Sequence, residues 1–276
     1  MKKIVVSFLC LLCFGLSYAQ EKPNSSLYGT GNWDADSLGN HRVVVSVNQP
    51  TDAVLAKMEW RRRDFDPEKK NIIVVDAKTG ERITNVCRFA IDREKGEIAF
   101  QPKTVPGEYY IYYLKNVMSG SRYYPTVTYP AFEETASSDW MKKNKLTGKK
   151  APQLPAAKVV QYQAINEFNS FYPMELIATN KEKESLLKSK SNESYILFTE
   201  DRRFPIRMTT DIPYKWIEDN RHDFFEGSAD KGEYYTFQIG VWAANKDVKH
   251  IQVQFSALKN SKTGDVIPAS SFTCFN

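Results

Sequence analysis

Short runs of alternating apolar and polar residues, each closed by a turn, are the feature that most constrains this fold. In VLAKMEW, residues 54–60, every second side chain is apolar, which is the period of a half-buried strand. Turn-forming segments at residues 78–81 and 92–96 separate the runs that follow. Strands that recur roughly every 8–12 residues with such turns predict an antiparallel β-sandwich.

The pattern changes after residue 130. The segment SSDWMKKNKL, residues 137–146, predicts one short helix capped by a serine. The segment TGKKAPQLPAA that follows has no periodicity and contains Gly, Pro and Lys, which predicts a boundary between domains. We therefore expect a signal peptide over residues 1–19, a β-sandwich domain over 20–130, a short helix and linker over 131–156, and a second β-sandwich domain over 157–276 that is truncated at its C-terminus.

The second domain differs from the first by an inset of strand, helix and strand. Thr179 and Glu182 fit a capping box that starts a helix ending near Ser189. An apolar run at Tyr195–Phe198 then predicts the next strand. Further strands are expected at residues 157–165, 204–208, 233–244, 250–258 and 272–276. The predicted fold class is therefore mainly β, with two antiparallel β-sandwich domains and this inset.

The N-terminus has the features of an export signal. Lys2 and Lys3 precede an apolar stretch from Ile4 to Leu16, and a small residue, Ala19, ends the segment. The stretch is shorter than the about 20 residues that span a bilayer. We expect a periplasmic or extracellular protein with no membrane attachment after cleavage.

Charge and cysteine content exclude some classes of function. The chain has 38 Lys and Arg against 33 Asp and Glu, a net charge of +5, which is too slight and dispersed to indicate nucleic-acid binding. Outside the signal segment only Cys87 and Cys274 remain. In an oxidising compartment they can form one disulfide, or both can be buried as small apolar residues.

Aromatic residues beside arginines give the candidate binding residues. Trp60 is followed by three consecutive arginines, which can bind an anionic sugar by stacking and charge. A solvated strand end balanced by Asp64 and Asp66 is the alternative interpretation. The candidate glycan contacts are Trp33, Trp60, Arg61, Arg62, Arg63 and Trp242.

No catalytic, cofactor or metal site is predicted. Glycoside hydrolysis usually needs two carboxyl groups flanking the bond, but the adjacent pairs of this sequence lie in charged turns. Nothing there is expected to raise a carboxyl pKa. These pairs are Glu133–Glu134, Glu200–Asp201 and Glu218–Asp219. Asp34 and Asp36 fit a turn better than a calcium loop, and the three histidines lack metal-ligand spacing.

Several segments in order resemble the N-terminal, non-catalytic region of secreted bacterial glycoside hydrolases of family 123. They are LYGTGNWDADSLGNHRVVV, MEWRRRD, EYYIYYL, FYPMELIAT, LFTEDRRFPIRM, GEYYTFQIGV and SSFTCFN. The resemblance implies β-sandwich domains that precede a (β/α) barrel, whose adjacent Asp and Glu cleave N-acetylgalactosaminides. A barrel needs about 250 residues, and no segment here supplies them, so no catalytic residue is carried over.

Two functions follow as hypotheses. The first is the accessory part of a carbohydrate-degrading enzyme, inactive alone, whose partner is a catalytic barrel encoded downstream. An apolar surface near Phe272–Phe275 is expected where such a barrel would pack. The second is an independent glycan-binding or cell-surface interaction module, which requires an exposed row of aromatic side chains.

Overall fold

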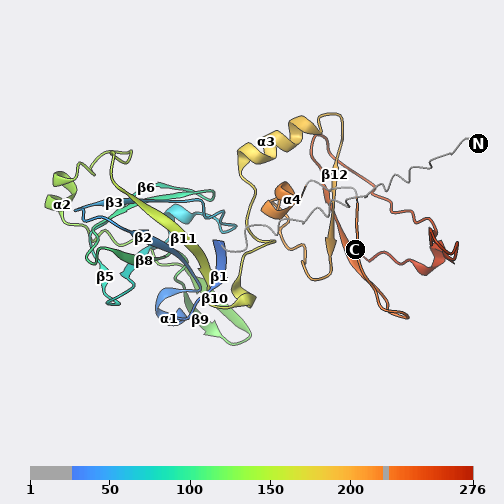
Figure 1. Cartoon of the computed structure of the whole chain (residues 1–276), viewed down its shortest axis with the longest axis horizontal. Helices are drawn as coiled ribbons and strands as arrows, with labels where there is room; N and C mark the ends of the chain where they lie inside the picture. The colour runs from blue at the N-terminus through green and yellow to red at the C-terminus, as the bar shows by residue number, and fades with distance from the viewer. Residues whose placement is uncertain (1–26, 220–223, 276) are drawn as a thin grey trace, which may run out of the picture.

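The computed structural model describes residues 27–219 and 224–275. The protein is mainly β, with curled sheets. Figure 1 shows two lobes: the first contains the elements from β1 to β11, and the second contains α3, α4, β12 and the C-terminal segments. The predicted signal peptide, residues 1–19, lies outside the described residues.

One curled sheet forms the first lobe. Its strand order is β5-β4-β8-β2-β11-β3-β7-β6, with β1 paired to β11. Most neighbours are antiparallel, but β11 pairs in parallel with β1 and β3. The strands are β1 (Tyr28–Thr30), β2 (His41–Val47), β3 (Val54–Met58), β4 (Ile73–Asp76), β5 (Arg82–Ile83), β6 (Val86–Ile91), β7 (Gly96–Phe100), β8 (Gly107–Tyr112) and β11 (Ala156–Ala164).

The core of the first lobe lies inside the curl of this sheet. Alternate residues of β2, at positions 43, 45 and 47, and the facing residues of β3, β7 and β8 form one buried apolar cluster. Each fully buried aliphatic or aromatic side chain contributes about 1.5–3 kcal/mol. The alternation that predicted these strands therefore also determines which face of the sheet is buried.

Strand β11 holds the two halves of the sheet together. Residues 158–164 pair with β2, and residues 156–157 pair with Leu55–Ala56 of β3. The sequence analysis assigned this strand to a second domain that begins at residue 157. Its period predicted a strand correctly, but a period does not say which sheet the strand joins, and β11 belongs to the first.

Helix α2 (Ser138–Lys143) packs on the outside of the curled sheet and begins as predicted. The Ser137 side chain accepts a hydrogen bond from the Trp140 backbone N–H. Trp140 is 5% exposed, and its Nε1 donates to the carbonyl oxygen of Asp52 at 2.8 Å. It packs with Ala53, Leu55 and other buried residues in a second apolar cluster. The expected linker is therefore part of the packed lobe.

The second lobe is built on a two-stranded antiparallel sheet. β12 (Ile196–Asp201) pairs with β13 (Phe237–Trp242). One face packs against α3 (Asn180–Ser189) and α4 (Tyr214–Glu218), where the Phe198 and Trp216 rings stack at 4.2 Å. Helix α3 has the predicted capping box between Thr179 and Glu182. In the first lobe, the Asp34 side chain caps the short helix α1 (Ala35–Leu38). This segment is the one for which the sequence analysis preferred a turn to a calcium loop.

Three predicted strands of the second lobe are absent from the described residues. Residues 204–208 contain one bend and no strand, residues 250–257 belong to no sheet, and residues 272–275 follow a 3-10 turn. Only β14 (Leu258–Lys259) and β15 (Val266–Ile267) pair in this region. Alternation of apolar and polar residues is not enough to form a strand where no neighbouring strand completes the backbone hydrogen bonds.

A β-hairpin that the sequence analysis did not predict projects from the first lobe. It consists of β9 (Val117–Ser121) and β10 (Tyr124–Thr128), and every residue in both strands is exposed. Figure 1 shows it extending from the lower edge of the lobe.

The two cysteines that the structure describes do not form a disulfide. Cys87 and Cys274 are both free, Cys87 buried against α2 and Cys274 exposed. The disulfide alternative is therefore wrong, and the alternative of lone buried cysteines is right for Cys87 only. No helix among the described residues is long and apolar enough to cross a membrane.

The buried contact of α2 gives a stability prediction. Trp140→Ala is expected to lower the free energy of unfolding by about 3–5 kcal/mol, because it leaves a cavity and removes a hydrogen bond. Urea unfolding followed by circular dichroism measures this change. Phe168→Ala is the control, since Phe168 is 86% exposed, and is expected to change the free energy by less than about 0.5 kcal/mol. Equal effects of the two variants would contradict the packing described for α2.

Candidate functional site

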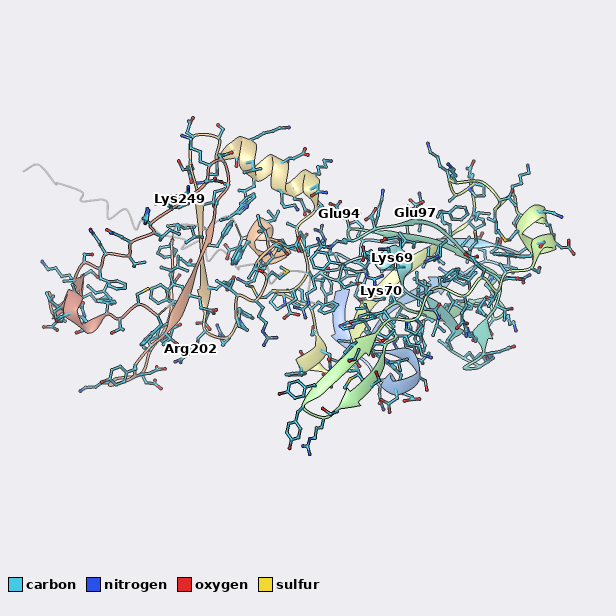
Figure 2. All side chains as sticks on the ribbon, turned by 180° about the vertical axis from the view of Figure 1, so that it is seen from behind. Lys69, Lys70, Glu94, Glu97, Arg202 and Lys249 are labelled. Atoms are coloured by element: carbon cyan, nitrogen blue, oxygen red, sulfur yellow. The ribbon has the colours of Figure 1, made fainter. Side chains whose placement is uncertain are left out.

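The three arginines that follow β3 lie where the two lobes meet, and each points into a different environment. The positive φ of 48° at Arg61 interrupts the extended backbone after Trp60. The Arg61 carbonyl oxygen accepts a hydrogen bond from the Ile177 N–H of the second lobe at 3.1 Å. Figure 2 shows Glu94, from the turn that faces these arginines, at the same junction.

Arg61 makes the strongest contact between the lobes. Its Nη1 and Nη2 atoms each lie 2.8 Å from one oxygen of Glu182, so the ion pair is bidentate. The guanidinium also stacks 3.7 Å over the Tyr214 ring and is largely buried. Burial raises the pKa of Glu182, but the hydrogen bonds from Arg61 and the Thr179 N–H outweigh it, and the net shift is downward. Glu182 therefore has two roles: it caps α3, and it binds Arg61 of the first lobe.

Arg62 points the opposite way, into the first lobe. It is fully buried, and its Nε and Nη2 atoms donate to the two oxygens of Asp64 at 2.9 and 2.8 Å. Nη2 also donates to the Tyr113 carbonyl oxygen. Lys70 Nζ lies 2.7 Å from the same carboxylate. Burial raises the pKa of Asp64, and these cations lower it further than burial raises it.

Arg63 is the one exposed member of the triplet. Its Nη2 atom lies 3.2 Å from Glu175, which also pairs with Arg207. On the neighbouring turn, Arg93 donates to both oxygens of Asp211 in the second lobe. The junction is therefore a set of charge-assisted hydrogen bonds, which are stronger than neutral ones. We call Arg61, Arg63, Arg93 and their partners Glu182, Glu175 and Asp211 the junction clamp.

The tryptophans among the candidate glycan contacts are packed against protein. Trp60 is 1% exposed and donates its Nε1–H to the Asp92 carbonyl oxygen. Trp242 is half-buried and packs against the core of the second lobe. Trp33 is half-buried, donates to the Gly39 carbonyl oxygen at 2.7 Å, and covers the Arg42 guanidinium at 4.4 Å. The structure brings Trp60 and the three arginines together, but Trp33 and Trp242 lie elsewhere.

Among the described residues, every carboxyl group whose pKa is displaced has a lowered pKa, whereas a general acid needs a raised one. Glu200 differs from the expectation of a solvated turn. It is 2% exposed and accepts hydrogen bonds from Lys215 and the Trp216 indole N–H. No cluster of metal-binding side chains occurs in residues 27–219 or 224–275.

Exposed aromatic side chains gather instead at the tip of the β9–β10 hairpin. Tyr123 is 85% exposed and Tyr124 is 83% exposed. By contrast, Tyr109, Tyr112 and Tyr113 in the segment EYYIYYL are buried. The turn of the hairpin, Arg122–Tyr123, is not one of the Asn-Gly or Asp-Gly dipeptides that mark a two-residue hairpin loop, so local sequence carried no clear signal for it.

The Arg61–Glu182 pair gives a second prediction, tested by a double-mutant cycle. Arg61→Met, Glu182→Gln and the double variant are expected to yield a coupling energy of about 1.5–3 kcal/mol, because the pair is bidentate and partly buried. Urea unfolding of the four proteins measures it. The exposed pair Arg82–Glu133 is the matched control and is expected to give about 0–1 kcal/mol. No difference between the cycles would contradict the clamp.

His41 gives a third prediction, on acid stability. Its Nε2–H donates to the Asn169 carbonyl oxygen at 2.7 Å, its Nδ1 has no partner, and its ring stacks on Phe171 at 4.0 Å. Burial lowers the pKa of His41 from 6.5 to about 4. The unfolded chain therefore takes up the proton first, so stability present above pH 6.5 is lost as the pH falls towards 4.

Over this pH range, we expect His41 alone to lower the free energy of unfolding of the wild-type protein by up to about 3 kcal/mol. His41→Gln keeps a hydrogen-bond donor but does not titrate, so the free energy of unfolding of this variant should fall by up to about 3 kcal/mol less. His250→Gln, on an exposed residue, is the control. Urea unfolding at several pH values compares them, and parallel curves for wild type and His41→Gln would refute the assignment.

Comparison with known proteins gives one match. The family model of the glycoside hydrolase 123 N-terminal domain matches residues 31–165. No curated protein and no solved structure matches the chain. The match ends at the residue that follows β11, so it covers the whole curled sheet except β1. Residues 31–165 therefore belong to the glycoside hydrolase family 123 N-terminal domain, the family that the sequence resembles.

Proposed function

We propose that this chain is a non-catalytic part of an exported glycoside hydrolase and that its second lobe packs against a catalytic barrel. The match of residues 31–165 to the N-terminal domain of such enzymes is the observation that carries the proposal. The junction clamp supports it, because charge-assisted hydrogen bonds hold the second lobe against this domain. A scaffold for a third unit needs such a defined orientation.

The second lobe has an apolar surface that suits a large protein partner. On the outer face of β13, Phe237, Ile239 and Val241 are 40%, 45% and 39% exposed. The segment that follows exposes Ile251 and Val253. Exposed apolar patches of this kind mark interaction sites, and a two-stranded sheet leaves backbone groups on its edges unpaired. Near the C-terminus Phe275 is 86% exposed, in keeping with the expected apolar surface there.

The chemistry of the described carboxyl groups favours a supporting role. Hydrolysis of a glycosidic bond needs a group that can donate a proton at neutral pH, and the displaced carboxyl pKa values are all lowered. The adjacent pair Glu200–Asp201 is held by Lys215, Trp216 and Tyr235. The hydrogen bond from Tyr235 lowers the pKa of Asp201, which suits a structural contact.

Export completes the proposal. The segment of residues 1–19 has the charge and apolar pattern of a signal peptide, so we place the protein in the periplasm or outside the cell. Mass spectrometry of the mature protein, expected to begin at Gln20, tests this part independently.

Activity gives the fourth prediction. The purified chain is expected to release no nitrophenol from 4-nitrophenyl N-acetylgalactosaminides of either anomeric configuration, because none of the described carboxyl groups has the raised pKa of a general acid. Turnover proportional to the concentration of the chain would contradict the non-catalytic role. An active family 123 enzyme, assayed in parallel, controls for the quality of the substrate.

The fifth prediction tests whether the second lobe binds a catalytic barrel. The chain is expected to co-elute with the isolated barrel of a family 123 enzyme in size-exclusion chromatography. Ile239→Lys should abolish co-elution, because it places a charge in the apolar face of β13. Phe168→Lys is the matched control, because it makes an equally drastic change at an 86% exposed residue in the 3-10 turn of Glu167–Asn169, outside strand β13. Co-elution that Ile239→Lys leaves unchanged would refute this surface as the docking site.

A further inference from the structure

The β9–β10 hairpin is an arm whose side chains serve no packing role in the molecule. Both of its strands are exposed along their whole length, and the rest of the first lobe is complete without it. Figure 2 shows its side chains projecting away from the lobe. At its tip, the rings of Tyr123 and Tyr124 are 85% and 83% exposed. Large aromatic side chains held this far from any core suggest a ligand that stacks on them.

Hydroxyl groups cover one face of the arm. The strand register places Tyr124 opposite Ser121 and Thr126 opposite Ser119 on the same face. Of the eleven residues from Ser119 to Tyr129, seven carry a hydroxyl group. Tyrosine rings present an apolar surface, and the neighbouring hydroxyls both donate and accept hydrogen bonds. A sugar ring has the complementary groups, an apolar C–H face and hydroxyls at its rim.

The arm is also positively charged. Residues 109–132 contain two charged side chains, Lys115 and Arg122, and no carboxylate. Neither cation takes part in an ion pair within the described residues. Arg122 lies beside Tyr123 in the turn, where its guanidinium can bind a carboxylate or sulfate through two hydrogen bonds.

We propose that the β9–β10 arm binds an acidic polysaccharide, with Tyr123 and Tyr124 stacking on sugar rings and Arg122 binding a carboxylate or sulfate. The proposal rests on the proposed function for the expectation that the ligand is a glycan, and it adds the class of that glycan. Tyrosine and arginine are also enriched in protein interfaces, so a tyrosine-dependent dimer is one outcome of the test below. The hydroxyl groups of Ser119 and Ser121, on the same face as Tyr124, favour a glycan.

Binding of the full chain to immobilised polysaccharides tests the proposal by biolayer interferometry. Dextran sulfate and polygalacturonate are the acidic probes, and dextran is the neutral one. Wild type is expected to bind the acidic probes more tightly than dextran. The double variant Tyr123→Ala/Tyr124→Ala should bind about tenfold more weakly, the loss expected for two stacking contacts. Arg122→Ala should weaken binding to the acidic probes and reduce its salt dependence.

Tyr234→Ala is the matched control, because Tyr234 is 96% exposed on the other lobe and should leave affinity unchanged. The arm contacts no core, so all variants are expected to keep the wild-type melting temperature. Three results would overturn the proposal: equal binding by wild type and the double tyrosine variant, no binding to either acidic probe, or a tyrosine-dependent dimer without polysaccharide binding. Ile239→Lys, which tests barrel docking, should still bind polysaccharide, so failure of one proposal is distinguishable from failure of the other.

Discussion

The bidentate ion pair between Arg61 and Glu182 is the interaction on which the arrangement of the two lobes depends. Arg61 follows β3 of the curled sheet, and Glu182 belongs to the capping box of α3, so one carboxylate completes a helix N-terminus and a contact between lobes. The capping box restrains the Glu182 side chain through hydrogen bonds that do not involve Arg61, which reduces the side-chain entropy lost in forming the pair. The pairs of Arg63 and Arg93 lie beside it and depend on the same orientation.

The segment of Trp60 and the three arginines resembles a sugar-binding site in sequence because a junction between lobes uses the same side-chain properties. Stacking on aromatic rings and bidentate hydrogen bonds to anions are the properties of arginine that serve both purposes. Arg61 stacks on Tyr214 and binds the carboxylate of Glu182, and Arg62 lies near Trp60 and binds Asp64. The anion in both cases is a carboxylate of the protein itself. A partner far along the chain, such as Glu182, cannot be identified from the residues around position 61.

The two lobes present different surfaces for the two partners that the proposals require. The first has a continuous core and presents an aromatic, cationic arm at its edge, while the second has a core on one side of a two-stranded sheet and apolar residues on the other. The arm suits a glycan because it combines rings, hydroxyls and charge, and the face of β13 suits a protein because it is apolar and sheet-like. The two surfaces lie on different lobes, so one partner need not exclude the other.

The sequence by itself determined local elements: the caps at Ser137 and Thr179, alternating strands of the curled sheet such as β3, and the resemblance of residues 31–165 to a domain family. These follow from periodicity and from hydrogen bonds between residues a few positions apart. Tertiary structure decided that β11 joins the first sheet, that residues 250–257 join none, and that Trp60, Arg61 and Arg62 are buried while Tyr123 and Tyr124 are exposed. Burial and strand pairing depend on which distant segments meet, and no local pattern of side chains specifies that.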